Sequence, residues 1–88
     1  MPKRRPDVVI LLDILTALVY GPKAPTRLAQ TCNLSYDNLV RFVARLESSR
    51  LVERRAEEGR ELFAITAEGL GVQRDFTQVL LKLGMVRV

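Results

Sequence analysis

The turn at residues 32–34 constrains the fold of this chain more than any other feature. A short helical pattern from about Thr26 to Thr31 precedes the turn, and a longer one from about Tyr36 to Ser49 follows it. Asn33 is one of the few non-glycine residues that accept a left-handed backbone conformation, and Ser35 is a good N-cap for the second helix. The sequence therefore predicts two helices held close together by a tight turn.

The longer helix is predicted to have one apolar and one polar face. Its apolar residues recur at three- and four-residue spacing, which is typical of a core-facing side: Leu39, Phe42, Val43 and Leu46. The opposite side carries Asn38, Arg41, Arg45 and Ser48.

These polar residues are of the types that contact duplex DNA. Arginine suits guanine O6 and N7, and asparagine suits adenine N6 and N7, so we expect Asn38, Arg41 and Arg45 to face base edges. Ser35 and Tyr36 lie at the helix N-terminus, where phosphate oxygens are commonly held. Two alternatives remain open: Asn38 supports only the helix N-terminus, and the arginines form a solvated face.

A charged β-hairpin is predicted after this helix. Two β-like segments, Leu51–Arg55 and Glu61–Thr66, are joined by residues 57–60, where Gly59 can supply a positive φ. Three arginines of the hairpin are candidates for contact with a phosphate backbone or a minor groove: Arg54, Arg55 and Arg60. The alternative is that Arg54 and Arg55 pair with the hairpin glutamates Glu53, Glu57 and Glu58.

Two further helices flank this unit. The first is predicted over residues 7–20, with Asp7 at its N-terminal end, and residues 22–25 form a short extended connector after it. The last is predicted over residues 67–83, capped by Thr66 and ended by Gly84. Gly69 and Gly71 are expected to weaken its start by about 1 kcal/mol each relative to alanine.

Both flanking helices have more apolar surface than one small core can cover. The first is apolar nearly all round, apart from a stripe of Asp13, Thr16 and Tyr20. The last is expected to form a dimer interface through its apolar residues Leu70, Val72, Phe76, Val79, Leu80 and Leu83. A homodimer is therefore predicted, with the first helix as a second contributor to the interface.

Composition narrows the function classes. The chain of 88 residues suffices for one domain, and its net charge of +4 favours an anionic partner, nucleic acid before a membrane surface. With no histidine and a single cysteine, Cys32, it offers neither a Cys/His zinc site nor an internal disulfide. It also shows no nucleophile with a base partner and no glycine-rich phosphate loop. We expect no cofactor and no enzymatic activity.

The N-terminus faintly imitates a secretory signal, because Lys3-Arg4-Arg5 precedes the apolar run from Val8 to Leu12. Asp7 and Asp13 interrupt that pattern, and the run is too short to span a bilayer, which takes about 20 apolar residues. The expected location is cytoplasmic and associated with the nucleoid. The three basic residues are expected to form a tail or a flexible DNA-contacting arm.

The stretch from Thr26 to Leu70 resembles a winged helix-turn-helix domain, and in particular the small archaeal, ArnR-like winged-helix regulators. The resemblance is carried by residues 26–28, 33–36, 46, 51–52 and 63–69. It implies a homodimeric transcription regulator or a DNA-architectural protein, in which the helix after the wing makes the dimer. Here that helix is shorter than in members that dimerise through a long coiled coil.

The predicted fold is mainly α with a small β-hairpin wing and an extra C-terminal helix. We divide the chain into a basic tail (1–6), a winged-helix domain (7–84) that includes the dimerisation helix (67–83), and a short tail (85–88). The predicted function is duplex DNA binding, with residues 35–49 in the major groove and the wing, 51–66, on the backbone or minor groove. The alternatives are a chromatin-type architectural role and a protein-interaction module.

Overall fold

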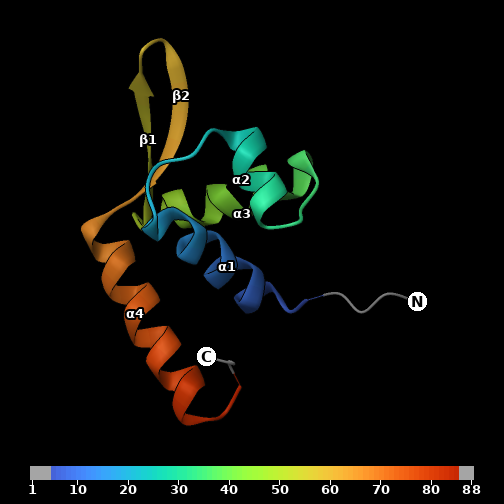
Figure 1. Cartoon of the computed structure of the whole chain (residues 1–88), viewed down its shortest axis with the longest axis vertical. Coiled ribbons are helices and arrows are strands. Elements are labelled where there is room, and N and C mark those ends of the chain that lie inside the picture. Colours follow the sequence, from blue (N-terminus) through green and yellow to red (C-terminus); the bar gives the residue numbers. More distant parts are fainter. Residues whose placement is uncertain (1–4, 86–88) are drawn as a thin grey trace.

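A computed structural model describes residues 5–85, in which four helices and one hairpin follow one another in the predicted order. The elements are α1 (Asp7–Val19), α2 (Pro25–Thr31), α3 (Tyr36–Ser48), β1 (Val52–Glu57), β2 (Arg60–Ile65) and α4 (Ala67–Lys82). The hairpin and α4 project in opposite directions from a core of three helices (Figure 1). The predicted mainly α fold with a hairpin wing is confirmed.

The turn between α2 and α3 has the predicted chemistry. Asn33 has a φ of 56°, and the amide of Leu34 donates to the carbonyl oxygen of Ala29 at 2.9 Å, which closes the end of α2. The hydroxyl of Ser35 accepts from the amide of Asn38 at 3.2 Å and so caps α3. Because both ends of this connection are held by local hydrogen bonds, α3 starts at a defined place.

The strands of the hairpin extend closer to the turn than predicted, so the turn is tighter. The two central turn residues, Glu58 and Gly59, have φ values of 52° and 74°, as in a two-residue turn of type I′. Glu57 and Arg60, expected in the loop, are therefore paired across the strands. The antiparallel register runs from that pair to Val52 opposite Ile65 at the base of the wing.

The connector between α1 and α2, predicted as a short extended segment, is paired with the wing. The amide of Lys23 donates to the carbonyl of Phe63 at 3.0 Å, and the amide of Phe63 donates back at 2.9 Å. This isolated antiparallel bridge pairs the connector with β2, outside the two-stranded sheet. It ties the base of the wing to the start of α2, so the wing and the helices are positioned together.

The core lies where α1, α2 and α3 meet the base of the wing. Its fully buried side chains are Ile14, Leu18, Leu28, Leu39 and Val43. In α4, by contrast, Gly69 is the buried residue, and the helix beyond it packs along α1 while keeping several apolar side chains exposed. Within residues 5–85 no helix is long and apolar enough to span a membrane.

Candidate nucleic-acid interface

The outward face of α3 carries the candidate base-contacting residues. Arg41, Arg45 and Ser48 are exposed, and Asn38 is half-buried, while the four apolar residues predicted for the core side are all buried. The amphipathic pattern of this helix therefore places its polar and apolar faces as the sequence predicted. Arg41 and Ser48 lie opposite the core, whereas Asn38 and Arg45 lie toward one flank of the helix.

Asn38 takes part in the N-terminal support of α3. Its backbone amide receives the Ser35 cap, and its side-chain oxygen accepts from Nη1 of Arg41 at 3.5 Å. The Arg41 guanidinium has four further N–H donors, and no ion pair engages it within the described part of the chain. Arg41 is thus an exposed cation with its donors available.

Arg45 leans toward the start of α1. Its Nη1 lies 3.4 Å from Oδ2 of Asp7, and both side chains are more than half exposed. An exposed pair at this distance contributes little to stability, of the order of 0–1 kcal/mol. It does place a negative charge beside Arg45 that an incoming phosphate would have to displace.

Tyr36, Val40 and Ala44 follow one another at four-residue spacing along α3, and all three are exposed. The Tyr36 side chain is 55% exposed and that of Val40 is 38% exposed. Apolar groups of this size can contact the thymine methyl in a major groove. In the sequence Tyr36 was distinguished only by its position at the helix start, and Val40 and Ala44 were not predicted, because the residue types typical of base contact are mostly polar. The helical spacing was the signal that would have found them.

Arg54 anchors the wing to α3. Its Nε and Nη2 donate to the two carboxylate oxygens of Glu47 at 2.8 and 3.2 Å, and its guanidinium also lies 3.5 Å from Glu61. The same group sits 5.4 Å from the centre of the Phe63 ring. The hydrogen bond to Glu47 and the charge of that carboxylate raise the pKa of Arg54. Its partners are therefore Glu47 and Glu61, and not the three hairpin glutamates that the sequence suggested.

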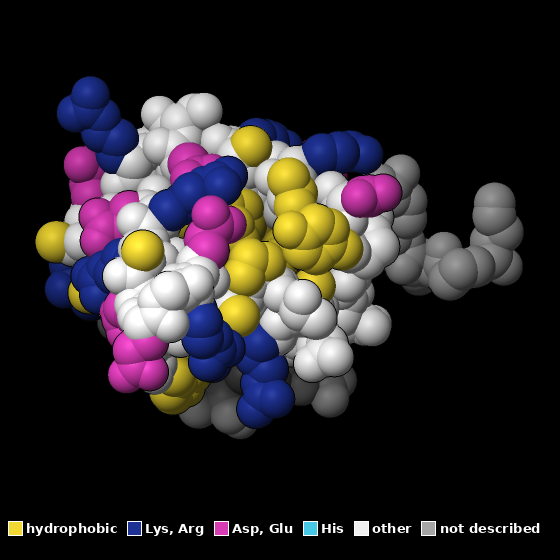
Figure 2. All heavy atoms as spheres, turned by 90° about the horizontal axis from the view of Figure 1, so that it is seen from above, with side chains coloured by type: hydrophobic (Ala, Val, Ile, Leu, Met, Phe, Trp, Pro, Cys, Tyr) yellow, Lys and Arg dark blue, Asp and Glu magenta, His cyan; other side chains and the backbone are white. Residues whose placement is uncertain are grey.

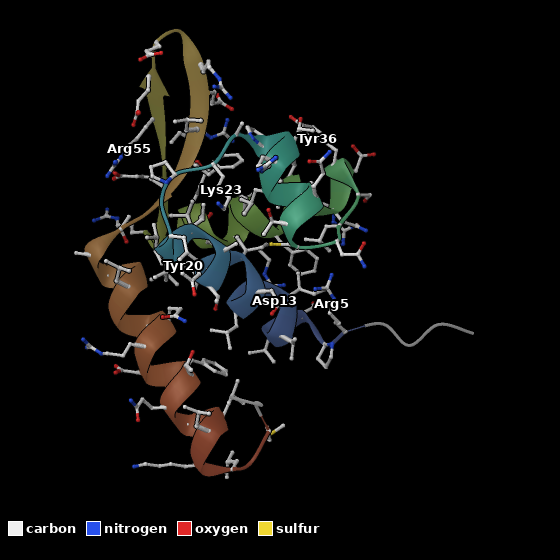
Figure 3. All side chains as sticks on the ribbon, in the orientation of Figure 1. Arg5, Asp13, Tyr20, Lys23, Tyr36 and Arg55 are labelled. Carbon is white, nitrogen blue, oxygen red and sulfur yellow. The ribbon has the colours of Figure 1, made fainter. Side chains whose placement is uncertain are left out.

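The other two wing arginines differ from each other. Arg55 pairs with Glu53 at 3.0 Å, one of the pairings considered from the sequence. Arg60 is exposed at the tip, and the structure of residues 5–85 shows no ion pair for it. Figure 3 shows Arg55 projecting from one side of the wing and Tyr36 on the other side, beside α2.

Positive and negative side chains are mixed at the end of the molecule that carries the wing. In Figure 2, which looks down on this end, lysine and arginine side chains are interleaved with acidic ones around exposed apolar side chains. The ion pairs of Arg54 and Arg55 are examples of this mixing. Arg41 and Arg60 are among the exposed cations of residues 5–85 that no ion pair engages.

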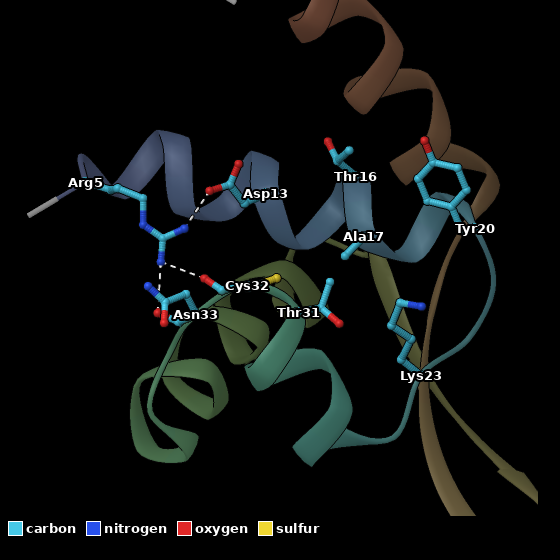
Figure 4. Close-up of a pocket in the computed structure, with 9 residues that line it drawn as sticks. All are labelled: Arg5, Asp13, Thr16, Ala17, Tyr20, Lys23, Thr31, Cys32 and Asn33. Atoms are coloured by element: carbon cyan, nitrogen blue, oxygen red, sulfur yellow. Dashed lines mark hydrogen bonds and ion pairs between the residues drawn. The ribbon is translucent and has the colours of Figure 1, made fainter.

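Arg5 is folded onto the helices. Its Nη1 lies 2.7 Å from Oδ2 of Asp13 in α1, and its Nη2 donates to the carbonyls of Cys32 and Asn33 at 2.7 and 3.2 Å (Figure 4). The sequence assigned it to the basic N-terminal tail. Its neighbours in that tail, Lys3 and Arg4, lie outside the described residues.

The candidate dimer residues of α4 fall on more than one side of the helix. Val72, Phe76 and Val79 line an exposed hollow of about 300 Å³, and the first two also border an apolar hollow of about 130 Å³ against α1. Leu83 is exposed on the same side by helical spacing, whereas Leu70 is exposed on another side. Leu80 lies with α1 residues Val9 and Leu12 in a separate hollow.

Cys32 is a buried side chain of the core, with 4% of its surface exposed. Burial and the nearby Asp13 carboxylate raise the pKa of its thiol from 9.0 to about 11. We predict that the folded protein resists alkylation by iodoacetamide at pH 8.

The unfolded Cys32 thiol ionises near pH 9, so this group's contribution to stability is complete below pH 9 and is lost as the pH rises to 11. Urea titrations from pH 8 to 11 should show a smaller alkaline loss in Cys32→Ala than in the wild type.

Comparison with known proteins gives a consistent picture of the fold. Residues 4–83 match the protein family described as Winged helix-turn-helix, whereas no curated protein sequence matches the chain. The transcriptional regulator BldR from Sulfolobus solfataricus shares the fold with a TM-score of 0.79 and 24% identity, over 85% of this chain and 56% of BldR. A point mutant of Lactococcus lactis ZitR matches with a TM-score of 0.75 and 16% identity, over 94% of this chain and 61% of ZitR.

A third similar structure is the homodimeric winged helix-turn-helix DNA-binding domain (fragment 1–100) of Mb0332 from Mycobacterium bovis, described as a possible ArsR-family transcriptional regulator. It has a TM-score of 0.66 and 25% identity, over 89% of this chain and 79% of that domain. The chain spans less than two thirds of BldR and ZitR. The family match covers nearly the whole chain and agrees with the observed order of helices and hairpin, so this protein belongs to the winged helix-turn-helix family.

Proposed function

We propose that this protein binds duplex DNA as a homodimeric transcriptional regulator. In this proposal α3 enters the major groove, and the wing contacts the backbone or the adjacent minor groove. The observation that carries the proposal is Arg41: its guanidinium is exposed opposite the core, on the second helix of a capped helix-turn-helix unit. The description of the similar Mb0332 fragment as a DNA-binding domain supports the same proposal.

In this proposal the side chains of α3 have different roles in DNA binding. Arg41 has the donors for a bidentate contact with guanine or a phosphate. Tyr36, Val40 and Ala44 offer an apolar strip beside it, suited to thymine methyl groups. Ser35 and Ser48 supply hydroxyls for backbone phosphates at the two ends of the helix, while Asn38 orients Arg41 through the 3.5 Å contact.

Within the wing, the free cation at the tip is the proposed DNA contact. Arg60 is exposed and can reach a phosphate or a minor groove, and Arg55 can join it by exchanging Glu53 for a phosphate. Arg54, held by Glu47 on α3, keeps the wing at a fixed angle instead. In this proposal the exposed Arg60 contacts the DNA, whereas the paired Arg54 holds the hairpin in place.

The homodimer in the proposal forms through α4 and the adjoining part of α1. Val72, Phe76, Val79 and Leu83 present a continuous apolar strip beside the hollow against α1, and no other element of residues 5–85 fills that hollow. Mb0332, which shares the fold, is homodimeric. A two-fold dimer would place two α3 helices in successive major grooves, about 34 Å apart.

A protein-interaction role is the second candidate, because the exposed strip of Tyr36, Val40 and Ala44 on α3 also suits an apolar partner. Neither role includes catalysis in our proposal.

An architectural protein would differ from a specific regulator in its specificity ratio. Comparing a defined operator with random duplex separates the two, since only the specific regulator shows a large ratio of affinities.

The test of the proposed function is a salt titration. Arg41→Ala should weaken duplex binding about tenfold, as expected for loss of a charge-assisted hydrogen bond, and should flatten the plot of log affinity against log salt by about 0.9. Arg45→Ala should have a smaller effect, because Asp7 already neutralises part of its charge. Fluorescence anisotropy between 50 and 200 mM salt, the range over which phosphate contacts are commonly compared, measures both quantities.

Arg74→Ala provides the matched control, because it removes one exposed arginine from α4, where the side chain pairs with Asp75 at 3.6 Å. Its affinity and salt slope should stay close to those of the wild type. An Arg41→Ala variant that behaves like Arg74→Ala would refute the placement of α3 in the groove. Binding that is absent or insensitive to salt in the wild type would instead favour the protein-interaction role.

A further inference from the structure

The contact between Arg5 and the α2–α3 turn joins three parts of the chain that lie far apart in sequence. Arg5 precedes α1, Asp13 lies in the middle of α1, and Cys32 and Asn33 form the turn itself (Figure 4). The guanidinium reaches Asp13 on one side and both turn carbonyls on the other, with the shortest contacts at 2.7 Å. The Arg5 side chain is about two-thirds buried in this position.

The turn carbonyls that Arg5 binds are those left open by the end of α2. Local hydrogen bonds already occupy the carbonyls of Leu28, Ala29 and Gln30, which accept from the amides of residues 32, 34 and 33. The carbonyls of Cys32 and Asn33 lie beyond this pattern, and Arg5 donates to both. A cation with a planar fork of donors suits two neighbouring carbonyls and one carboxylate at once.

We propose that Arg5 is a positioning residue that couples α1 to the orientation of α3. The turn held by Arg5 ends at Ser35, the cap of α3, so a shift of the turn shifts the start of that helix. On its other side α1 packs against α4, to which it is also linked by a hydrogen bond of 3.2 Å between Thr16 and Gln73. The bridge therefore transmits the placement of α1 and α4 to the helix that we propose reads DNA. The part of this inference that concerns DNA binding rests on the proposed function.

A direct phosphate contact by Arg5 is the competing explanation, and the two predict opposite effects of Asp13→Asn. This substitution keeps the size of the side chain and removes the negative charge that holds Arg5. If Arg5 contacts phosphate, neutralising Asp13 releases the guanidinium and makes the protein more cationic, so DNA binding becomes tighter. If Arg5 positions the turn, the same substitution loosens the bridge, so binding becomes weaker.

The experiment is a double-mutant cycle on the full chain, with Arg5→Gln, Asp13→Asn and the double variant titrated against one duplex by anisotropy. We expect Arg5→Gln to weaken binding roughly tenfold, the size of a lost charged hydrogen bond, with the salt slope matching that of the charge control Arg74→Gln. Asp13→Asn should weaken binding by a smaller factor and have no further effect in the Arg5→Gln background. Tighter or unchanged binding by Asp13→Asn, or a slope reduced by about 0.9 in Arg5→Gln alone, would overturn the proposal.

Amide hydrogen exchange in the free protein tests the bridge without DNA. The amides of Asn33 and Leu34 close the turn, and their protection should fall about tenfold in Arg5→Gln, while that of Leu70 in the first turn of α4 stays unchanged. Unchanged protection at the turn would overturn the positioning role even if DNA affinity fell. Conversely, a wild type that fails to bind duplex DNA would count against the proposed function alone, because the exchange result would still decide whether Arg5 holds the turn.

Discussion

Gly69→Ala is expected to lower the free energy of unfolding by about 2–3 kcal/mol, although alanine is the better helix former. A Cβ built at this position overlaps the carbonyl oxygen of Leu51 and lies 2.8 Å from Cγ1 of Ile65. Neither group is free to move aside. The Leu51 carbonyl accepts from the amide of Thr66 at 3.0 Å, and Ile65 is paired with Val52 at the base of the wing.

Gly71, two residues further along α4, is the matched control. A Cβ there meets nothing within 4 Å, so Gly71→Ala should raise stability by about 0.5–1 kcal/mol through helix propensity alone. Urea unfolding of the two variants gives both values against the wild type. Equal responses would mean that the close approach of α4 to Leu51 does not limit this position.

This pair of glycines shows where the sequence was informative and where it was not. Both were expected to weaken the start of α4, and helix propensity treats them alike. Gly69 differs because Leu51, just before β1, and the helix that follows β2 meet at that point, which is a contact between residues 18 positions apart. The sequence-based interpretation of Gly69 was incomplete, since the glycine permits the approach on which the junction depends.

Features governed by neighbouring residues were predicted correctly. The caps Ser35 and Thr66 accept from amides three residues ahead, and Asn33 and Gly59 adopt positive φ values. Each of these depends on the chemistry of one short segment. Helical spacing likewise separated the buried side of α3 from the side that carries Arg41.

Features that depend on distant residues could not be predicted in this way. The bridge between Lys23 and Phe63, the ion pair between Arg54 and Glu47, and the contact of Arg5 with the α2–α3 turn all need the register of the folded chain. Arg50, with a φ of 61° just after α3, has no residue-type signal for that conformation. The candidate site was therefore predictable as a face of α3 but not as a set of engaged and free arginines.

Val79→Lys is expected to separate the proposed dimer and to reduce affinity for a two-half-site duplex by about 100-fold, because a second binding event on the same duplex is lost. Val79 is 53% exposed and lines the hollow beside Val72 and Phe76, so the single chain can accommodate lysine, whereas an apolar interface cannot. Sedimentation velocity at micromolar concentration should shift from dimer to monomer. Binding to a single half-site should change little, since α3 and the wing are untouched.

Leu81→Lys separates the loss of the interface from the effect of an added charge. Leu81 is also an exposed apolar residue of α4, but it does not line the hollow formed by Val72, Phe76 and Val79. Both variants add one positive charge, which by itself favours DNA. If Leu81→Lys remains a dimer and binds both duplexes as the wild type does, the loss in Val79→Lys belongs to the interface. A wild type that sediments as a monomer, or a Val79→Lys variant that keeps its affinity for the longer duplex, would show that two copies of α3 need not be joined through this face of α4.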